Sequence, residues 1–143
     1  MSQTIEHNAS ACRSSRHTRV QHLITADESS LVELEALLAT LPLCSTGRVF
    51  VEVPDSTWQA ILTAPARMVV TWLDRSQRSG DPGSGRTCTP GVALARAVCA
   101  WSDDMLCEDD DHTRIHLLGG YLGTADIVEH LADRRGIPVA SIN

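Results

Sequence analysis

The chain has 143 residues, 43% of them hydrophobic, and a net charge of −6. This length suits one domain whose core needs neither a disulfide nor a metal to hold it together. The acidic balance argues against broad contact with nucleic acid, and no apolar run approaches the roughly 18 residues of a membrane-spanning helix. The five cysteines are odd in number and form no CxxC pair, which favours reduced thiols. With no apolar segment typical of a signal peptide, the sequence predicts a cytoplasmic protein.

The first half of the chain alternates predicted strands with helices. Residues 1–17 are polar and aperiodic, so we expect a disordered tail followed by one domain over 18–143. A strand over 20–24 runs into a short polar turn, where Thr25-x-x-Glu28 resembles a capping box that starts a helix. That helix carries leucines at helical spacing as far as Pro42: Leu31, Leu34, Leu37, Leu38 and Leu41. Further strands are predicted over 48–53 and 67–73, with a short helix over 56–62 between them.

The second half continues the alternation. A glycine-containing loop over 74–88 is long enough to be mobile or functional. Thr89-Pro90 is a good N-cap and first-turn pair for a helix over 91–101. An acidic segment over 103–111 is predicted to be a solvated loop, and a strand over 114–118 follows it. The last helix is predicted over 124–135, and residues 139–143 would begin a final strand.

This alternation predicts an α/β fold, a three-layer Rossmann-like sandwich with a mostly parallel sheet of about five strands. Ligands of such sheets bind at the carboxyl ends of the strands. We therefore expect the turns over 26–30, 72–75 and 119–121 to meet at one edge of the sheet.

At these turns the chain resembles the C-terminal, pyridine-nucleotide-binding domain of siderophore-interacting proteins, which belong to the ferredoxin-reductase-like flavoenzymes. The similarity covers about residues 19–142 and depends on the order and spacing of four motifs. These are Ala26-Asp27-Glu28-Ser29-Ser30-Leu31, Val51-Glu52-Val53-Pro54-Asp55, Val70-Thr71-Trp72-Leu73-Asp74-Arg75 and His130-Leu131-Ala132-Asp133-Arg134-Arg135-Gly136-Ile137-Pro138.

The resemblance implies NAD(P)H binding and a part in ferric-siderophore reduction and iron utilisation. The family's flavin-binding barrel has no counterpart among the predicted elements, so we expect that FAD is not bound by this chain alone and that a flavin-binding partner protein supplies it. Leu118-Gly119-Gly120 stands where the family usually has Ala-Gly-Glu, Asp74 replaces a histidine, and the family's closing Gly-Tyr-Trp is not found after Ile142. These departures affect flavin contact and electron delivery.

The first turn supplies four candidate cofactor-binding residues. Asp27 and Glu28 could hydrogen-bond a ribose, or could simply start the helix, where acidic residues suit the dipole. The amides of Glu28, Ser29 and Ser30 could hold a phosphate at the helix N-terminus. Two adjacent acids and the absence of GxGxxG make pyrophosphate binding of the usual dinucleotide kind less favourable there.

The other two turns supply the remaining candidates. Arg75 could pair with a 2′-phosphate through its guanidinium fork, assisted by Arg78 and Arg86, or could be a solvated loop arginine. Trp72 could stack on an adenine or belong to the core.

Gly119 and Gly120 allow close approach of the backbone to a nicotinamide, or form a plain turn. No arrangement of nucleophile, base and acid stands out in the sequence, so the catalytic residues are left unassigned.

Three functions remain open. The first is a stand-alone nucleotide-binding domain that works with a flavin-bearing partner. The second is a non-catalytic protein-interaction module with a degenerate nucleotide site, and a homo-oligomer is compatible with either. The third is a small metal-dependent enzyme that uses the acidic loop, His112 and His116.

Overall fold

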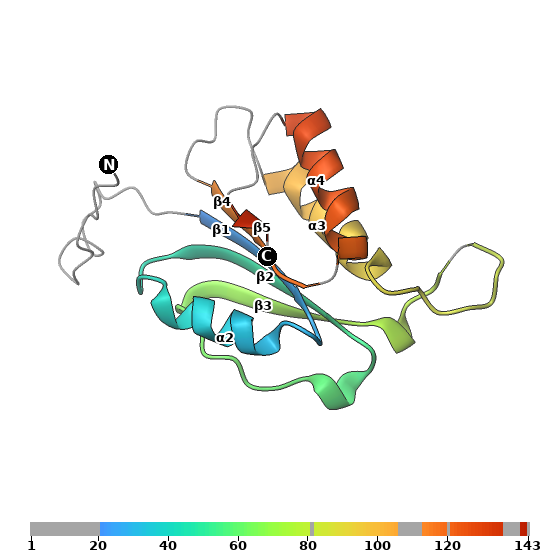
Figure 1. The fold of residues 1–143 in the computed structure, drawn as a ribbon, viewed down its shortest axis with the longest axis horizontal. Helices are drawn as coiled ribbons and strands as arrows, with labels where there is room; N and C mark the ends of the chain where they lie inside the picture. The colour runs from blue at the N-terminus through green and yellow to red at the C-terminus, as the bar shows by residue number, and fades with distance from the viewer. Residues whose placement is uncertain (1–20, 81, 106–112, 120, 136–140, 143) are drawn as a thin grey trace.

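The computed structural model describes residues 21–80, 82–105, 113–119, 121–135 and 141–142 (Figure 1). The predicted tail over 1–17 and most of the acidic segment lie outside these residues. In chain order the elements are β1 (Gln21–Asp27), α2 (Leu31–Thr40), β2 (Thr46–Val53), the 3₁₀ turn η1 (Ser56–Trp58), β3 (Arg67–Asp74), the 3₁₀ turn η2 (Arg75–Gln77), α3 (Val92–Met105), β4 (Thr113–Leu117), α4 (Tyr121–Arg135) and β5 (Ser141–Ile142).

The strands form one parallel sheet in the order β3-β2-β1-β4-β5. Four strands have five to eight residues, and β5 adds a two-residue pairing to β4. The chain builds outward from β1 through β2 to β3, then crosses back to place β4 on the other side of β1. The carboxyl ends of β1 and β4 therefore form a topological switch point, the position at which open α/β sheets bind ligands.

Helices cover both faces of the sheet (Figure 1), which confirms the predicted three-layer α/β fold. Helix α2 packs on one face, while α3 and α4 lie together on the other. Successive side chains of a strand point to opposite faces. In β1, Leu23 joins the cluster under α3 and α4, whereas Ile24 joins the cluster under α2, and both are fully buried. Burial on both faces explains the near-continuous apolar runs of the sequence.

The predicted capping box at Thr25-x-x-Glu28 is wrong. Strand β1 continues to Asp27, which pairs in register with Glu52 of β2. Thr25 is fully buried within that strand, and α2 begins four residues later than Asp27, with Ser30 at its N-cap. The ladder with β2 runs through seven consecutive residue pairs, so tertiary pairing overrides the local capping preference of the sequence.

Other boundaries differ from prediction as well. The last helix, expected over 124–135, begins three residues earlier, at Tyr121. The short helix expected over 56–62 is only the 3₁₀ turn over Ser56–Trp58. The helix expected over 91–101 extends to Met105, so that Asp103 and Asp104, predicted as loop, are helical.

The loop over 74–88 is more ordered than its glycines indicate. It begins with η2 and returns on itself through an antiparallel bridge between Ser79 and Thr87. Arg96 of α3 donates hydrogen bonds to the carbonyls of Ser79 and Gly80 at 2.8 and 3.4 Å. Within the described residues, no helix is long and apolar enough to cross a membrane.

Candidate functional site

Three aspartates organise the ends of three neighbouring strands. Asp27 is the last residue of β1, Asp55 lies just beyond β2, and Asp74 is the last residue of β3. Each carboxylate accepts a hydrogen bond from the backbone N–H two residues later, at 2.9, 2.9 and 2.8 Å respectively. Such Asx turns reverse the chain locally without a left-handed residue. Two of the residues that follow these aspartates, Glu28 and Arg75, meet across the carboxyl edge of the sheet.

At the switch point, Asp27 and Gly119 lie against each other. Gly119 has a φ of +105°, a conformation that favours glycine, and a Cβ added there would lie 2.7 Å from the Asp27 carboxyl carbon. Leu118 donates its N–H to the Thr25 carbonyl, which continues the pairing of β4 with β1 to this point. The glycine is therefore required by the approach of the carboxylate as well as by the turn. Gly120, its predicted companion, lies outside the described residues.

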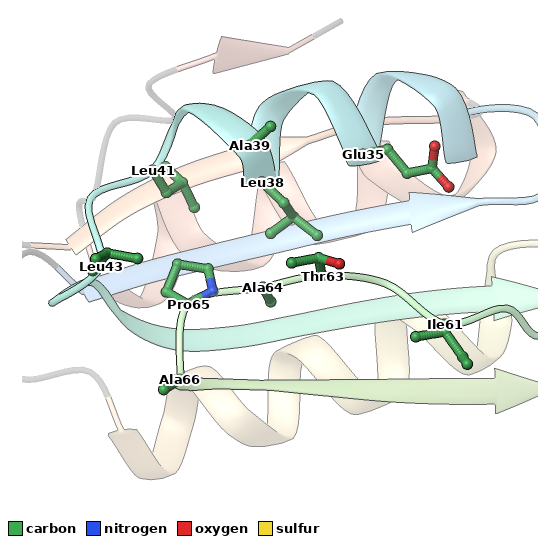
Figure 2. Close-up of a pocket in the computed structure, with 10 residues that line it drawn as sticks. All are labelled: Glu35, Leu38, Ala39, Leu41, Leu43, Ile61, Thr63, Ala64, Pro65 and Ala66. Atoms are coloured by element: carbon green, nitrogen blue, oxygen red, sulfur yellow. The ribbon is translucent and has the colours of Figure 1, made fainter.

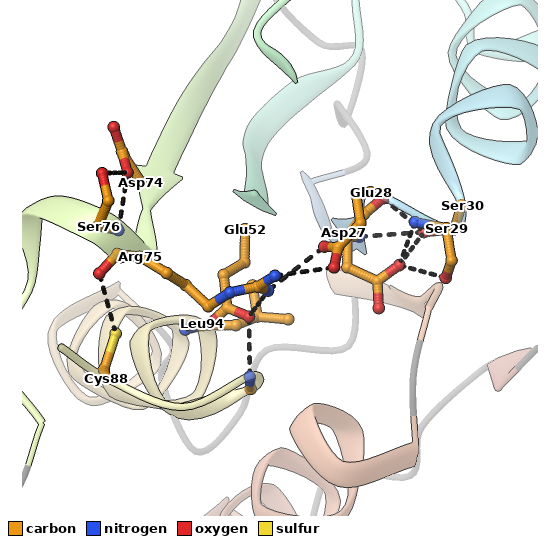
Figure 3. A network of polar contacts seen from close by, with 11 residues as sticks. Asp27, Glu28, Ser29, Ser30, Glu52, Asp74, Arg75, Ser76, Cys88 and Leu94 are labelled. Atoms are coloured by element: carbon orange, nitrogen blue, oxygen red, sulfur yellow. Dashed lines mark hydrogen bonds and ion pairs between the residues drawn. The ribbon is translucent and has the colours of Figure 1, made fainter. Parts of the chain in front are cut away.

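Arg75 joins the ends of three strands (Figure 3). Its Nη2 atom is 2.8 Å from Glu28 Oε1 and its Nη1 atom is 3.3 Å from Glu28 Oε2. The same Nη1 atom is 2.8 Å from Glu52 Oε2. Because Glu28 follows β1, Glu52 belongs to β2 and Arg75 follows β3, one guanidinium holds all three segments together.

Glu52 also caps helix α3. Its two carboxylate oxygens accept hydrogen bonds from the backbone N–H groups of Gly91 and Leu94 at 2.8 and 3.0 Å. These groups lie at the N-terminus of the helix, where donors lack partners within the helix and the dipole favours a negative charge. The Glu52 side chain is 2% exposed, and its ion pair and two amide bonds compensate the burial of its charge.

The ion pairs define the electrostatics of the edge. Hydrogen bonding to Glu28, opposed by desolvation and reinforced by Glu52, raises the pKa of Arg75 above its ordinary value. Two carboxylates surround one guanidinium, which leaves the cluster with a net negative charge. Arg75 is 9% exposed, so the alternative of a solvated loop arginine is wrong. Its predicted pairing with a 2′-phosphate stays a prediction.

The phosphate site predicted at the first turn is partly occupied by the protein itself. The amide of Ser29 donates to the Asp27 carboxylate, and the amide of Ser30 donates to the Asp27 carbonyl at 3.1 Å. The Ser30 hydroxyl accepts from the Asp27 amide at 3.0 Å and is buried. Two of the three predicted amide donors thus already have partners.

Trp72 packs against the cluster beneath α2 and is partly buried. This agrees with the core alternative for its role. Arg78 and Arg86 are exposed and line a cavity of about 470 Å³ formed by the hairpin after β3. They do not take part in the ion pairs of Arg75.

A second, larger cavity lies along α2 (Figure 2). It has a volume of about 600 Å³, with mainly aliphatic lining from α2 and the segment before β3, and Glu35 of α2 also lines it. None of the predicted site residues lines it.

Histidines come together at a different place from the one predicted. His116 of β4 stacks on His22 of β1, with ring centroids 5.6 Å apart. Burial, followed by the charges of His116 and Arg114, lowers the pKa of His22 to about 4. Within the described residues no group of three metal-ligating side chains occurs, and His112, the other histidine of the metal hypothesis, lies outside them.

Sequence reasoning missed Glu52 as a site residue. The signal was present, because Glu52 is a lone acid in the apolar strand Val49-Phe50-Val51-Glu52-Val53. A buried carboxylate in a central strand requires a partner. The Asp-x-Ser/Thr pattern at 27–29, 55–57 and 74–76 was a second readable signal for the strand ends.

Two groups of relatives place the chain among known proteins. Over 58 residues it is 38% identical to uncharacterised proteins of Mycobacterium bovis and Mycobacterium tuberculosis, which corresponds to 41% of this chain and 20% of theirs. Its fold is similar to that of the siderophore-interacting protein SipS from Aeromonas hydrophila, with a TM-score of 0.62 and 15% identity over 87% of this chain and 49% of that one. A siderophore utilization protein from T. fusca gives a TM-score of 0.62 and 21% identity over 88% and 43%.

The matched segment thus covers about a fifth of the length of the curated relatives, and the fold match covers less than half of these solved structures. The model of one protein family, described as siderophore-interacting protein, matches residues 20–143, which is most of the chain. The fold and this match together show that the chain belongs to the siderophore-interacting protein family.

Proposed function

We propose that the edge formed by the carboxyl ends of β1 and β4 binds NAD(P)H, and that the chain takes part in ferric-siderophore reduction with a flavin-bearing partner. The observation that carries this proposal is the contact of Asp27 with Gly119 at the topological switch point of a parallel sheet. Membership of the siderophore-interacting protein family supports the role in iron utilisation.

The residues at this edge fit the ribose of a dinucleotide better than they fit its pyrophosphate. Two carboxylates already accept hydrogen bonds from amides that a phosphate at this edge would use. Asp27 accepts from Ser29 just before α2, and Glu52 accepts from Gly91 and Leu94 at the N-terminus of α3. A ribose fits such a site, because carboxylates accept hydrogen bonds from hydroxyl groups. The expected binding mode is therefore recognition of ribose and ring, with little contribution from helix dipoles to the pyrophosphate.

In the proposed reaction, this chain binds and orients NAD(P)H. The nicotinamide supplies a hydride when it is bound, and a flavin on the partner accepts it. Asp27 and the backbone at Gly119 would hold the cofactor at the switch point. No residue of this chain is assigned a proton transfer or a nucleophilic step.

Calorimetric titration with NADH tests the proposal. Gly119→Ala introduces a methyl group into the space of the Asp27 carboxylate, while Gly83→Ala makes the same change at a glycine that also has positive φ but no neighbour within 4 Å. We expect the first variant to weaken binding at least about tenfold, equivalent to about 1.4 kcal/mol, and the second to leave it unchanged. Equal affinities for both variants and the wild type would count against the edge as the binding site.

A non-catalytic interaction module is the second candidate. The observation that favours it is the capping of α3 by Glu52, together with the Asp27 carboxylate that already accepts the Ser29 amide before α2, as is expected of a degenerate nucleotide site. If correctly folded wild-type protein gives no heat of binding when it is titrated with millimolar NADH, this candidate is favoured over the first.

A further inference from the structure

The two carboxylates that hold Arg75 differ in how firmly they are themselves fixed. Glu52 is 2% exposed and accepts two backbone N–H groups of α3 besides its ion pair, so it cannot leave without exposing the helix terminus. Glu28 is 28% exposed, and its hydrogen bonds within the described part of the chain go to Arg75. One partner of the guanidinium is therefore permanent, whereas the other is open to replacement.

Glu28 contacts Arg75 in a bidentate geometry that a ligand anion could also adopt. Its two oxygens face two different nitrogen atoms of the guanidinium, at 2.8 and 3.3 Å. A phosphate monoester offers the same pair of acceptor oxygens to the same fork. A carboxylate from the protein and a phosphate from a ligand would compete for one position.

We propose that Glu28 is an internal occupant of the Arg75 anion site and so makes the site select NADH over NADPH. This inference rests on the proposed nucleotide binding at the carboxyl edge. A 2′-phosphate would have to displace Glu28 and would then lie close to the acidic Glu52, which shares the same guanidinium. A ribose with a free 2′-hydroxyl has no such requirement, and Glu28 can remain paired.

The test compares 2′,5′-ADP with 5′-AMP, which differ only in the 2′-phosphate, by calorimetric titration. Glu28→Gln removes the competing charge at nearly constant shape. Glu33→Gln makes the same change at an exposed residue in the first turn of α2 and serves as the matched control. We expect Glu28→Gln to raise the affinity for 2′,5′-ADP at least about tenfold, the scale of one charge-assisted hydrogen-bonded pair, and to change the affinity for 5′-AMP little.

Two further measurements separate binding at Arg75 from a general change of charge or fold. The Arg75 Nε–H signal of Glu28→Gln in a ¹⁵N NMR spectrum should shift on addition of 2′,5′-ADP, and circular dichroism should show that the variant is folded. Adding Arg75→Lys to Glu28→Gln should remove most of the gain, because an ammonium lacks the bidentate fork.

The outcomes distinguish the two proposals. If wild type binds 5′-AMP while Glu28→Gln gains nothing for 2′,5′-ADP, the role of Glu28 is overturned and nucleotide binding stands. If wild type binds neither nucleotide but Glu28→Gln binds 2′,5′-ADP through Arg75, the anion site stands and the native nucleotide function fails. A wild type that already binds 2′,5′-ADP more tightly than 5′-AMP, or a Glu28→Gln variant that binds neither, contradicts the selection mechanism.

Discussion

Arg75 and Glu52 form a nearly buried ion pair, with Nη1 and Oε2 2.8 Å apart and side chains 11% and 2% exposed. Glu52 adds the two amide hydrogen bonds at the N-terminus of α3. The pair thus connects the ends of β2 and β3 to the helix that crosses to β4. The local geometry of the candidate site depends on this one carboxylate.

Glu52→Ala should lower the free energy of unfolding by about 3–5 kcal/mol, because it leaves the buried guanidinium with one carboxylate and α3 without its cap. Urea denaturation measures this loss. Glu33→Ala removes an exposed carboxylate and should stay within about 0.5 kcal/mol of wild type. A loss below about 1 kcal/mol in Glu52→Ala would contradict a structural role for the pair.

Gly119→Ala should destabilise the fold more than Gly83→Ala. Both glycines have positive φ, so both substitutions carry a backbone cost of about 1–3 kcal/mol. Only at Gly119 would the new methyl group meet the Asp27 carboxylate, at 2.7 Å. The difference between the two melting curves therefore measures the contact of Asp27 with Gly119, and equal losses would show that the contact is relaxed in solution.

Stability should fall as the pH drops from about 6.5 to 4. Desolvation, followed by the charges of His116 and Arg114, lowers the pKa of His22 to about 4, and burial lowers the pKa of His116 as well. In this window the unfolded chain binds more protons than the folded chain, so protonation favours unfolding. The loss from His22 approaches about 3 kcal/mol at the lower end, at 1.36 kcal/mol per pKa unit.

His22→Leu should flatten this pH dependence. His130 of α4, partnered by Asp103 at 2.9 Å, offers the control, since His130→Gln changes a histidine outside the stacked pair. Unfolding free energies measured at pH 7, 5.5 and 4.5 would test the assignment. If the free energy of unfolding falls as steeply with decreasing pH in His22→Leu as in wild type, His22 is not the source of the pH dependence.

Thr25→Val should leave stability unchanged or raise it by about 1 kcal/mol. The Thr25 hydroxyl is fully buried and has no hydrogen-bond partner among the described residues. Replacing an unsatisfied polar group by a methyl group of similar volume removes a desolvation cost. A loss of 1 kcal/mol or more in thermal unfolding would show that the hydroxyl has a partner in solution.

The fold was predictable because its signals are local. The apolar runs of β2 and β3 and the leucine spacing of α2 mark buried strands and an amphipathic helix wherever they occur. The boundary at Thr25 was wrong for the opposite reason. Its capping motif is a genuine local preference, but pairing of β1 with β2 extends the strand to Asp27 and decides the outcome.

The site was only partly predictable because its contacts are long-range. Glu28 and Arg75 are 47 residues apart, and Glu52 and Arg75 are 23 apart. Their meeting depends on strand order and on the Asx turns at the strand ends, which periodicity does not reveal. The sequence indicated that Asp27, Arg75 and Gly119 follow strand ends, but it could not show that Arg75 is already paired.

Mapping NADH onto the chain by amide NMR shifts tests the central claim most directly. Millimolar NADH is expected to perturb the amides around Asp27 and Gly119, with smaller changes at Arg75 and few in the cavity along α2, near Leu38 and Ala64. Perturbations confined to that cavity, or none at all in folded protein, would contradict a nucleotide site at the carboxyl edge of the sheet.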